Sequence, residues 1–203
     1  MVRVSSFLVA CAYLWTCLAK SAAAAGDDIG DDELYYFGFP VDCRRRSNPP
    51  LPDNYFGNCS TIVTTESTYG KLRGCDGFLV AAEAVGEAIQ KTIGNGRGTM
   101  DGSVKFFFDS AERVGEMMGK RMVVVGGSSK FGLYGLDYGF GRPIKCEALS
   151  GNDSLEVVYF SDSRECRGGI EIGVSMSMDK MDAFAGLFGR GFGKAKEKLR
   201  CKM

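Results

Sequence analysis

A glycine-rich segment in the second half of the chain, residues 126–143, most strongly constrains the fold. It reads GGSSKFGLYGLDYGFGRP, and a short apolar run at residues 122–125 precedes it. Glycine adopts backbone angles that other residues avoid, so closely spaced glycines indicate a tightly turned loop rather than a helix. The segment therefore predicts a buried strand that leads into a long, turn-rich loop.

The length and composition of the chain suit one soluble domain or one lobe of a larger enzyme. The chain has 203 residues, 45% of them hydrophobic, which is enough to bury a sizeable core. Its 25 basic residues balance its 25 acidic residues, so no basic surplus points to nucleic acid or to a membrane surface. Helical and strand-like segments alternate, which favours an α/β layered fold.

Periodicity and turn residues predict the individual elements. Proline-rich residues 44–54 are expected to form an extended connector, and residues 21–32 a flexible loop. Strands are expected at residues 34–43, 62–65, 122–125, 144–149, 155–160 and 169–176. Helices are expected at residues 5–20, 76–93, 103–119 and 179–188.

The first of these helices contains an apolar run at residues 7–19 that also resembles a secretory signal. The run is short for a membrane span. Alternatively it is a buried helix capped by Ser5 or Ser6, with one apolar face at helical spacing. That face consists of Phe7, Cys11, Leu14, Trp15 and Leu18. Composition alone leaves both interpretations open.

The cysteines and the histidine content restrict metal binding and compartment. The chain has eight cysteines and no histidine, and no two cysteines form a C-x-x-C pair. Mixed cysteine–histidine zinc sites are therefore excluded, and we expect no metal site. Scattered cysteines favour free thiols in a reducing compartment, so a cytoplasmic location is expected. A secreted, disulfide-bonded domain is the alternative.

Several motifs, in order along the chain, resemble those of the BAHD acyltransferases of plants. The glycine-rich segment resembles their D-F-G-W-G signature, with two aromatic substitutions. A second match lies in residues 41–59, which contain segments similar to R-x-R, P-P-L-P and Y-F-G-N-C. Residues 5–20 resemble an internal helix of the family, which decides for the buried helix. The residues that match the signatures are Asp137, Tyr138, Gly139, Phe140 and Gly141, then Arg44 and Arg46, then Tyr55, Phe56, Gly57, Asn58 and Cys59.

The resemblance implies a fold, an activity and a truncation. The fold would be a chloramphenicol-acetyltransferase-like C-terminal lobe, with a mixed β-sheet flanked by helices, formed by residues 1–203 as one unit. The N-terminal catalytic lobe with its H-x-x-x-D motif would be missing. The family transfers an acyl group from acyl-CoA to a hydroxyl, and the Y-F-G-N-C form is typical of the branch that acylates phenolic glucosides and anthocyanins. Malonyl and hydroxycinnamoyl groups are the expected acyl groups.

The absence of histidine then implies that the chain supplies no catalytic residue. In the family the histidine is the general base, and we expect little or no turnover from this chain alone. Association with an N-terminal lobe or with an intact homologue is a further expectation. A non-catalytic remnant that binds CoA or a protein partner is the alternative function.

The resemblance also suggests roles for individual residues. Asp137 would pair with Arg44 or Arg46 and pin the loop to the first strand. A role as catalytic base is disfavoured, because a neighbouring guanidinium lowers the pKa of a carboxyl. The phosphates of acyl-CoA, the expected co-substrate, could bind at the start of the first helix or to basic residues of the glycine-rich loop. These candidates are Ser5, Ser6, Lys130 and Arg142; a plain helix cap and surface charges are the alternative.

Overall fold

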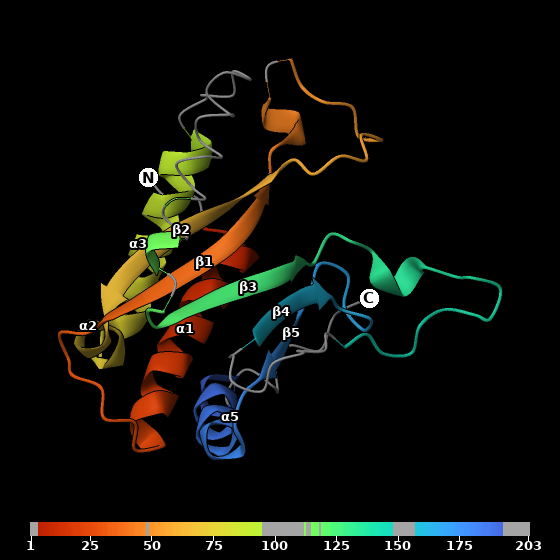
Figure 1. Ribbon diagram of the computed structural model, residues 1–203. Helices are drawn as coiled ribbons and strands as arrows, with labels where there is room; N and C mark the ends of the chain where they lie inside the picture. The colour runs from red at the N-terminus through yellow and green to blue at the C-terminus, as the bar shows by residue number, and fades with distance from the viewer. Residues whose placement is uncertain are drawn as a thin grey trace.

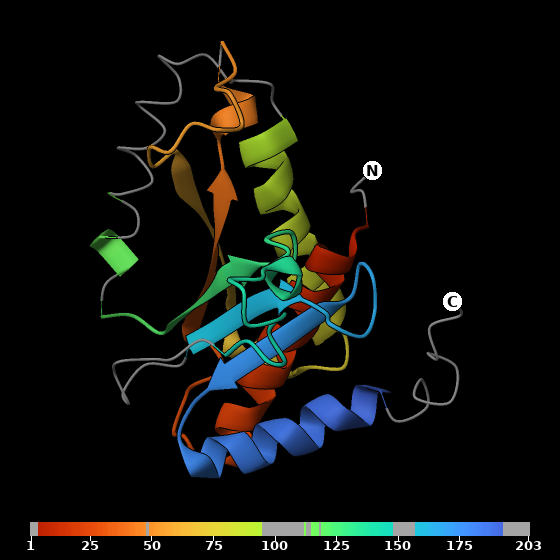
Figure 2. The ribbon, with the colours of Figure 1, turned by 90° about the vertical axis from the view of Figure 1, so that its right-hand side faces the viewer.

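The architecture is a five-stranded mixed sheet covered on one face by helices (Figures 1 and 2). The computed structural model describes residues 4–47, 49–94, 112, 115–117, 119–147 and 157–192. The strand order is β2-β1-β3-β4-β5. The strands are β1 (Leu34–Asp42), β2 (Ser60–Thr68), β3 (Met122–Ser128), β4 (Val157–Asp162) and β5 (Ile170–Ser175).

The pairing of the strands confirms the predicted mixed sheet. β1 pairs with β2, and β4 with β5, in antiparallel fashion, whereas β3 is parallel to both β1 and β4. β1 lies between β2 and β3, and its residues 35–39 are all buried, so side chains on both of its faces are shielded from solvent.

Helices α1, α3 and α5 pack on the same face of this sheet. The α-helices are α1 (Ser6–Ala24), α2 (Tyr69–Arg73), α3 (Gly77–Ile89) and α5 (Met178–Phe192); α3 continues into a π-helical turn, η2 (Gln90–Gly94). Two short 3₁₀ helices are η1 (Arg44–Arg46) and η3 (Leu133–Gly135).

The first helix lies in the core, as the buried-helix interpretation predicts. The hydroxyl of Ser5 caps it by accepting a 3.2 Å hydrogen bond from the amide of Leu8. Trp15 is fully buried and packs its ring 5.3 Å from that of Phe37 on β1. By length and composition α1 is the one described helix that could cross a membrane, yet 61% of its apolar window is buried inside the protein. In this fold α1 is a core helix.

Two sequence-based predictions of element boundaries are wrong. The predicted loop at residues 21–32 is helical as far as Ala24, because consecutive alanines have high helix propensity and Ala22 adds buried contact. The described part of the predicted strand at residues 144–149 is not a strand. Ile144 is largely exposed, and its carbonyl accepts a hydrogen bond from Arg164 instead of pairing in the sheet.

The remaining predicted strands agree with the structure where it describes them, whereas the extended connector predicted at residues 44–54 begins with the 3₁₀ helix η1. The helix predicted at residues 76–93 corresponds to α3 followed by the π-helical turn η2. The strands predicted at residues 34–43, 62–65, 122–125 and 169–176 correspond to β1, β2, β3 and β5. The strand predicted at residues 155–160 matches β4 from Val157 onward. Most of the helix predicted at residues 103–119 lies outside the described residues.

Two long excursions, which we call the first arm (residues 43–59) and the second arm (residues 129–147), leave the same edge of the sheet (Figure 1). The first arm follows β1 and the second follows β3. Because these two strands are parallel, their carboxyl ends lie at one edge, and both arms start there. The arms carry the motifs that the sequence singles out.

Candidate functional site

The first arm is closed at its base and held by short-range ion pairs. The amide of Cys43 donates a 2.9 Å hydrogen bond to the carbonyl of Cys59, which extends the β1–β2 pairing by one position. Further out, Arg45 forms two hydrogen bonds, of 3.0 and 2.7 Å, with the carboxylate of Asp53. This pair lowers the pKa of Asp53, first through its hydrogen bonds and then through the charge of Arg45.

The Y-F-G-N-C motif forms the returning half of the first arm. Its Asn58 accepts a 2.9 Å hydrogen bond from the Ser60 hydroxyl at the start of β2. Tyr55 is exposed, and Phe56 is fully exposed. The motif thus combines a polar anchor at the sheet with one partly exposed ring, Tyr55, and one fully exposed ring, Phe56.

The tip of the second arm is held by the carboxylate of Asp137. Its Oδ1 accepts hydrogen bonds from the amides of Gly139 (2.8 Å) and Gly141 (3.1 Å). Both glycines have left-handed backbone angles, with φ of 93° and 91°. Side chains other than glycine rarely adopt these angles, which accounts for the glycines of the motif.

The predicted ion pair between Asp137 and an arginine of the first arm does not form. Arg44 instead pairs with Asp42 through its Nε, at 3.1 Å from Asp42 Oδ1. Arg46 donates to the backbone carbonyl of Asp42. Both arginines are thus bound close to their own position in the sequence, and Asp137 is bound by amides of its own loop. The prediction is wrong for this structure because local partners satisfy all three groups.

Contacts that the motifs did not indicate fix the base of the second arm. The amide of Leu133 donates a 3.0 Å hydrogen bond to Asp162 at the end of β4. The hydroxyl of Tyr134 donates a 2.8 Å hydrogen bond to Glu171 on β5, and this bond raises the pKa of Tyr134. Tyr134 and Glu171 are 37 positions apart, so only the sheet order brings them together.

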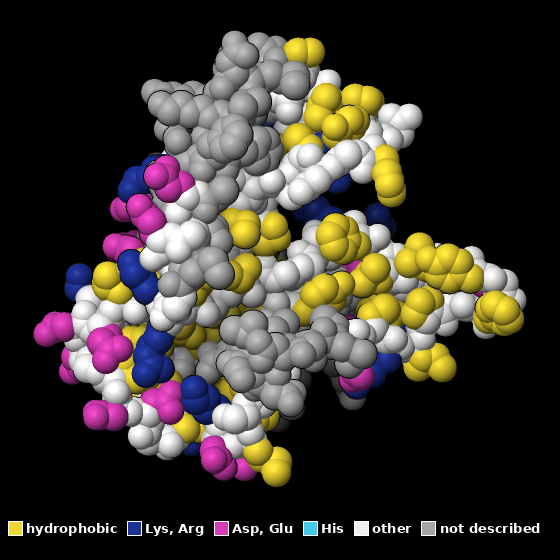
Figure 3. All heavy atoms as spheres, viewed as in Figure 1, with side chains coloured by type: hydrophobic (Ala, Val, Ile, Leu, Met, Phe, Trp, Pro, Cys, Tyr) yellow, Lys and Arg dark blue, Asp and Glu magenta, His cyan; other side chains and the backbone are white. Residues whose placement is uncertain are grey.

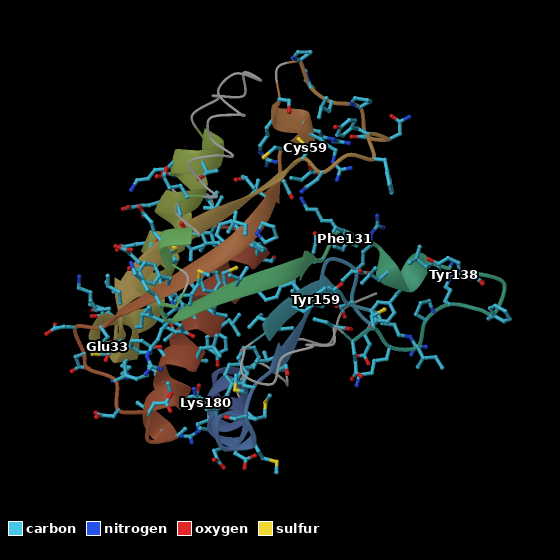
Figure 4. All side chains as sticks on the ribbon, in the orientation of Figure 1. Glu33, Cys59, Phe131, Tyr138, Tyr159 and Lys180 are labelled. Atoms are coloured by element: carbon cyan, nitrogen blue, oxygen red, sulfur yellow. The ribbon has the colours of Figure 1, made fainter. Side chains whose placement is uncertain are left out.

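Two cavities lie at this base. The first encloses about 410 Å³ between residues 145–147 of the second arm and strands β4 and β5, where it reaches Tyr159. Tyr159 lies on β4, between β3 and the edge strand β5 (Figure 4). The second has a volume of about 380 Å³, is partly open to solvent, and lies between the second arm and the β4–β5 connection. Its lining residues are Tyr134, Gly135, Arg142, Pro143 and Arg164.

The four residues expected to meet CoA phosphates lie in different settings. The hydroxyl of Ser5 is engaged in capping α1, as the alternative interpretation has it, and Ser6 is exposed beside it. Lys130 is exposed at the start of the second arm, and Arg142 lines the second cavity. In the described part of the chain, no hydrogen bond or ion pair joins the serines to either basic residue.

The described residues contain no arrangement typical of an acyl-transfer catalyst. The sequence has no histidine. Two described thiols, those of Cys17 and Cys43, lie near charged side chains, but burial raises the pKa of both, which makes them poor nucleophiles. No group of three or more Cys, Asp and Glu among the described residues is placed to hold a metal ion. Among the described cysteines six carry free thiols, as expected, whereas Cys166 is disulfide-bonded, contrary to the expectation.

What the two arms share is exposed apolar surface. Phe140 at the tip of the second arm is 98% exposed. Hydrophobic side chains run along both arms, and Lys and Arg side chains are visible between them (Figure 3). The large apolar side chains exposed on the arms are Tyr55, Phe56, Phe131, Leu136, Tyr138, Phe140 and Ile144. An exposed set of this kind marks a surface for interaction.

Comparison with known proteins places this fold and these motifs in one family. The model of the Transferase family matches residues 1–188. The chain is 40% identical to phenolic glucoside malonyltransferase 1 of Nicotiana tabacum over 94% of its own length and 41% of that protein. It is 36% identical, over 94% of its length and 40% of the relative, to the malonyl-coenzyme A:anthocyanin 3-O-glucoside-6''-O-malonyltransferase of Dahlia pinnata.

Solved structures agree on the fold. Vinorine synthase superposes with a TM-score of 0.67 at 18% identity, covering 92% of this chain and 42% of that enzyme. TRI101 of F. graminearum, in complex with coenzyme A and deoxynivalenol, superposes with a TM-score of 0.60 at 15% identity, covering 88% of this chain and 40% of that one. The chain spans about two fifths of the length of the curated relatives that it matches. The chain belongs to the Transferase family, that of the BAHD acyltransferases.

Proposed function

We propose that this chain is one lobe of an acyl-CoA-dependent acyltransferase that acts on phenolic glucosides or anthocyanins, and that its general base lies outside these 203 residues. The single observation that carries the proposal is the pair of arms with bare aromatic side chains, on a chain that has no histidine. The chain would contribute a binding platform, and the lobe that carries the base would contribute the proton acceptor.

The requirements of the reaction support this division of labour. Acyl transfer from a thioester to a hydroxyl needs a base that takes the hydroxyl proton and donors that stabilise the oxyanion. The absence of a positioned base alone lowers a rate by roughly 10²–10⁴. We therefore expect the chain by itself to have little or no turnover.

The choice of substrates follows the relatives. Proteins 35–40% identical to this chain are malonyltransferases of phenolic or anthocyanin glucosides. An agmatine coumaroyltransferase of Arabidopsis thaliana is 31% identical. We propose malonyl-CoA as donor and a glucose hydroxyl of a phenolic glucoside as acceptor, with acyl-CoA as co-substrate and no other cofactor.

Complementation tests the proposal. The chain is co-expressed with the part of the tobacco malonyltransferase that it does not match, and malonyl transfer from malonyl-CoA to a phenolic glucoside is followed by mass spectrometry. Activity is expected in the pair and not in either component alone. A rate for the isolated chain equal to that of the intact tobacco enzyme would overturn the proposal, as would a pair without activity that nevertheless co-purifies.

Variants of the arms give this experiment a matched control. Phe56→Ser and Phe140→Ser each replace an exposed ring of one arm and should weaken association and activity of the pair. Leu79→Ser replaces a side chain that is also exposed, at 58%, but lies on α3 outside the arms. Leu79→Ser should leave both the association of the pair and its activity unchanged. Equal effects of the three changes would show that the arms are not the docking surface.

The same surface favours a second candidate function, that of a non-catalytic protein that binds an intact relative. The exposed aromatic side chains of both arms are the observation that supports it. Two measurements distinguish this function from the first proposal. One is a pull-down of the full-length tobacco enzyme with this chain, and the other is the activity of that enzyme when this chain is added in excess. If the chain captures the full-length enzyme and inhibits it, the non-catalytic binding function is supported. If the chain restores activity to the unmatched part of the tobacco enzyme but does not capture the full-length enzyme, the acyltransferase lobe is supported.

A further inference from the structure

The second cavity joins two arginines that come from different parts of the chain. Arg142 enters it from the second arm, and Arg164 from the connection between β4 and β5. Neither guanidinium forms an ion pair with a carboxylate of the described residues. Two unpaired guanidinium groups beside one cavity create a local positive potential, which attracts anions.

One of the two arginines is held in place by its surroundings. The Nη1 atom of Arg164 donates a 3.1 Å hydrogen bond to the carbonyl of Ile144 in the second arm. Its backbone amide donates a 3.1 Å hydrogen bond to Glu171 Oε1. The side chain is therefore oriented before any ligand arrives, while its remaining N–H groups are left to bind one.

The nearby carboxylates are already engaged. Glu171 accepts from the Arg164 amide through Oε1 and from the Tyr134 hydroxyl through Oε2, and it lines the first cavity rather than the second. Asp162 accepts from the amide of Leu133. Lys145 and Glu147 neutralise one another. None of these acids lines the second cavity, so its walls carry a net positive charge.

We propose that this cavity is a phosphate-binding site in which Arg142 and Arg164 bind the anion from two sides. Guanidinium groups bind phosphate oxygens through paired, charge-assisted hydrogen bonds. The volume of about 380 Å³ is far larger than one phosphate group and falls in the range of small-molecule sites, about 300–1,000 Å³. A phosphate carried by a larger molecule therefore fits better than the free ion. The assignment of that molecule to acyl-CoA rests on the proposed function.

Titration calorimetry with adenosine 3′,5′-bisphosphate, which carries phosphates at the same ribose positions as CoA, tests the site. Binding is expected for the unaltered chain and should weaken as the salt concentration rises. Arg142→Gln and Arg164→Gln should each weaken it at least about tenfold, because each removes a charge-assisted hydrogen bond. Arg167→Gln is the matched control: it removes a charge from the same β4–β5 connection, but Arg167 does not line the cavity.

Two further ligands identify the source of the phosphate. Adenosine, which lacks phosphate, should not bind. Inorganic phosphate should compete with the bisphosphate; if it binds as tightly, the site holds free phosphate, and if it binds more weakly, the site holds a nucleotide-borne phosphate. No binding of either phosphate compound, or equal weakening by Arg167→Gln and Arg142→Gln, would overturn the inference.

The outcome is separable from that of the proposed function. If complementation with the tobacco lobe succeeds while neither arginine affects phosphate binding, the function stands and this site is rejected. If the two arginines bind phosphate but no complementation occurs, the site stands and the acyltransferase role is rejected. Thermal unfolding of each variant verifies that the exposed substitutions leave the fold intact.

Discussion

The carboxylate of Asp137 accepts a 2.8 Å hydrogen bond from the amide of Gly139, and through the same oxygen a second one from Gly141. This contact makes the glycine-rich turn a self-supporting loop. The turn does not need an arginine from elsewhere in the chain to keep its shape. Its aromatic side chains, Tyr138 and Phe140, remain largely exposed.

Replacement of Asp137 by alanine should loosen this turn without unfolding the chain. The amides of Gly139 and Gly141 would lose their acceptor, so their hydrogen exchange should accelerate while the free energy of unfolding falls by no more than about 1 kcal/mol. Asp137→Asn keeps a carbonyl acceptor and should exchange nearly as slowly as the unaltered chain. Equal exchange in the alanine and asparagine variants would contradict the assigned role of the side chain.

Two glycines of the motif should respond differently to alanine. Gly127 and Gly132 both have positive φ, of 72° and 67°. A Cβ at Gly127 would overlap the carbonyl of Phe160 and the ring of Tyr159, whereas a Cβ at Gly132 meets nothing within 4 Å. Gly132→Ala should therefore cost only the backbone strain, about 1 kcal/mol. Gly127→Ala should cost at least about 2 kcal/mol more, because packed strands must move apart. Urea denaturation measures the free energy of unfolding of both variants. Equal losses would argue against the close approach of Gly127 on β3 to Tyr159 and Phe160 on β4.

Trp15 should be the most costly side chain of α1 to truncate. It is fully buried against β1, so Trp15→Ala should destabilise the fold by about 3–5 kcal/mol. Its Nε1 has no hydrogen-bond partner among the described residues. Trp15→Phe removes that unpaired N–H and keeps a ring, and it should cost less than half as much. Phe56→Ala, at an exposed position, should change stability by less than about 0.5 kcal/mol. A large loss from Phe56→Ala would show that the first arm is part of the core.

Stability at high pH should depend on Tyr13. Burial is the main reason why its pKa rises from 10.0 to about 12, and the neighbouring Cys17 raises it further. The folded state thus favours the neutral phenol, so its contribution to stability is complete below pH 10 and is lost as the pH rises through about 12.

Tyr13→Phe isolates this effect from that of other groups that titrate at high pH. At neutral pH the variant should be less stable, because it loses the 2.7 Å hydrogen bond to the carbonyl of Phe188. The difference in the free energy of unfolding between the variant and the unaltered chain should become smaller between pH 10 and pH 12. Urea midpoints measured from pH 8 upward provide the comparison, and a gap that stays constant to pH 12 would reject the raised pKa.

Much of the scaffold could be predicted from local patterns. The apolar run of α1 and the aromatic run of β1 predict their elements because side-chain periodicity reports which face is buried. The glycines at positions 139 and 141 predict left-handed turns for a similar reason, since the backbone angles depend on the residue itself. Ala22 shows the limit, because helix propensity extended α1 into a segment whose composition suggested a loop.

The candidate site was less accessible to sequence reasoning. Arg44 was expected to reach Asp137, yet Asp42 lies two positions away from it and forms the shorter-range pair. Arg164 carried no motif, and its place in the second cavity depends on the antiparallel β4–β5 hairpin beside the second arm. Long-range polar contacts depend on strand order, which single residues do not encode.

The sequence by itself determined the family, the absence of histidine from these 203 residues, and the turns of the glycine-rich loop, because these depend on residue type and on neighbours along the chain. Only the tertiary structure decided that both arms leave one edge of the sheet and that Tyr134 meets Glu171. The physical reason is that parallel pairing of β1 and β3 aligns segments far apart in the chain, and side chains then bind whichever partner this alignment brings within hydrogen-bonding distance.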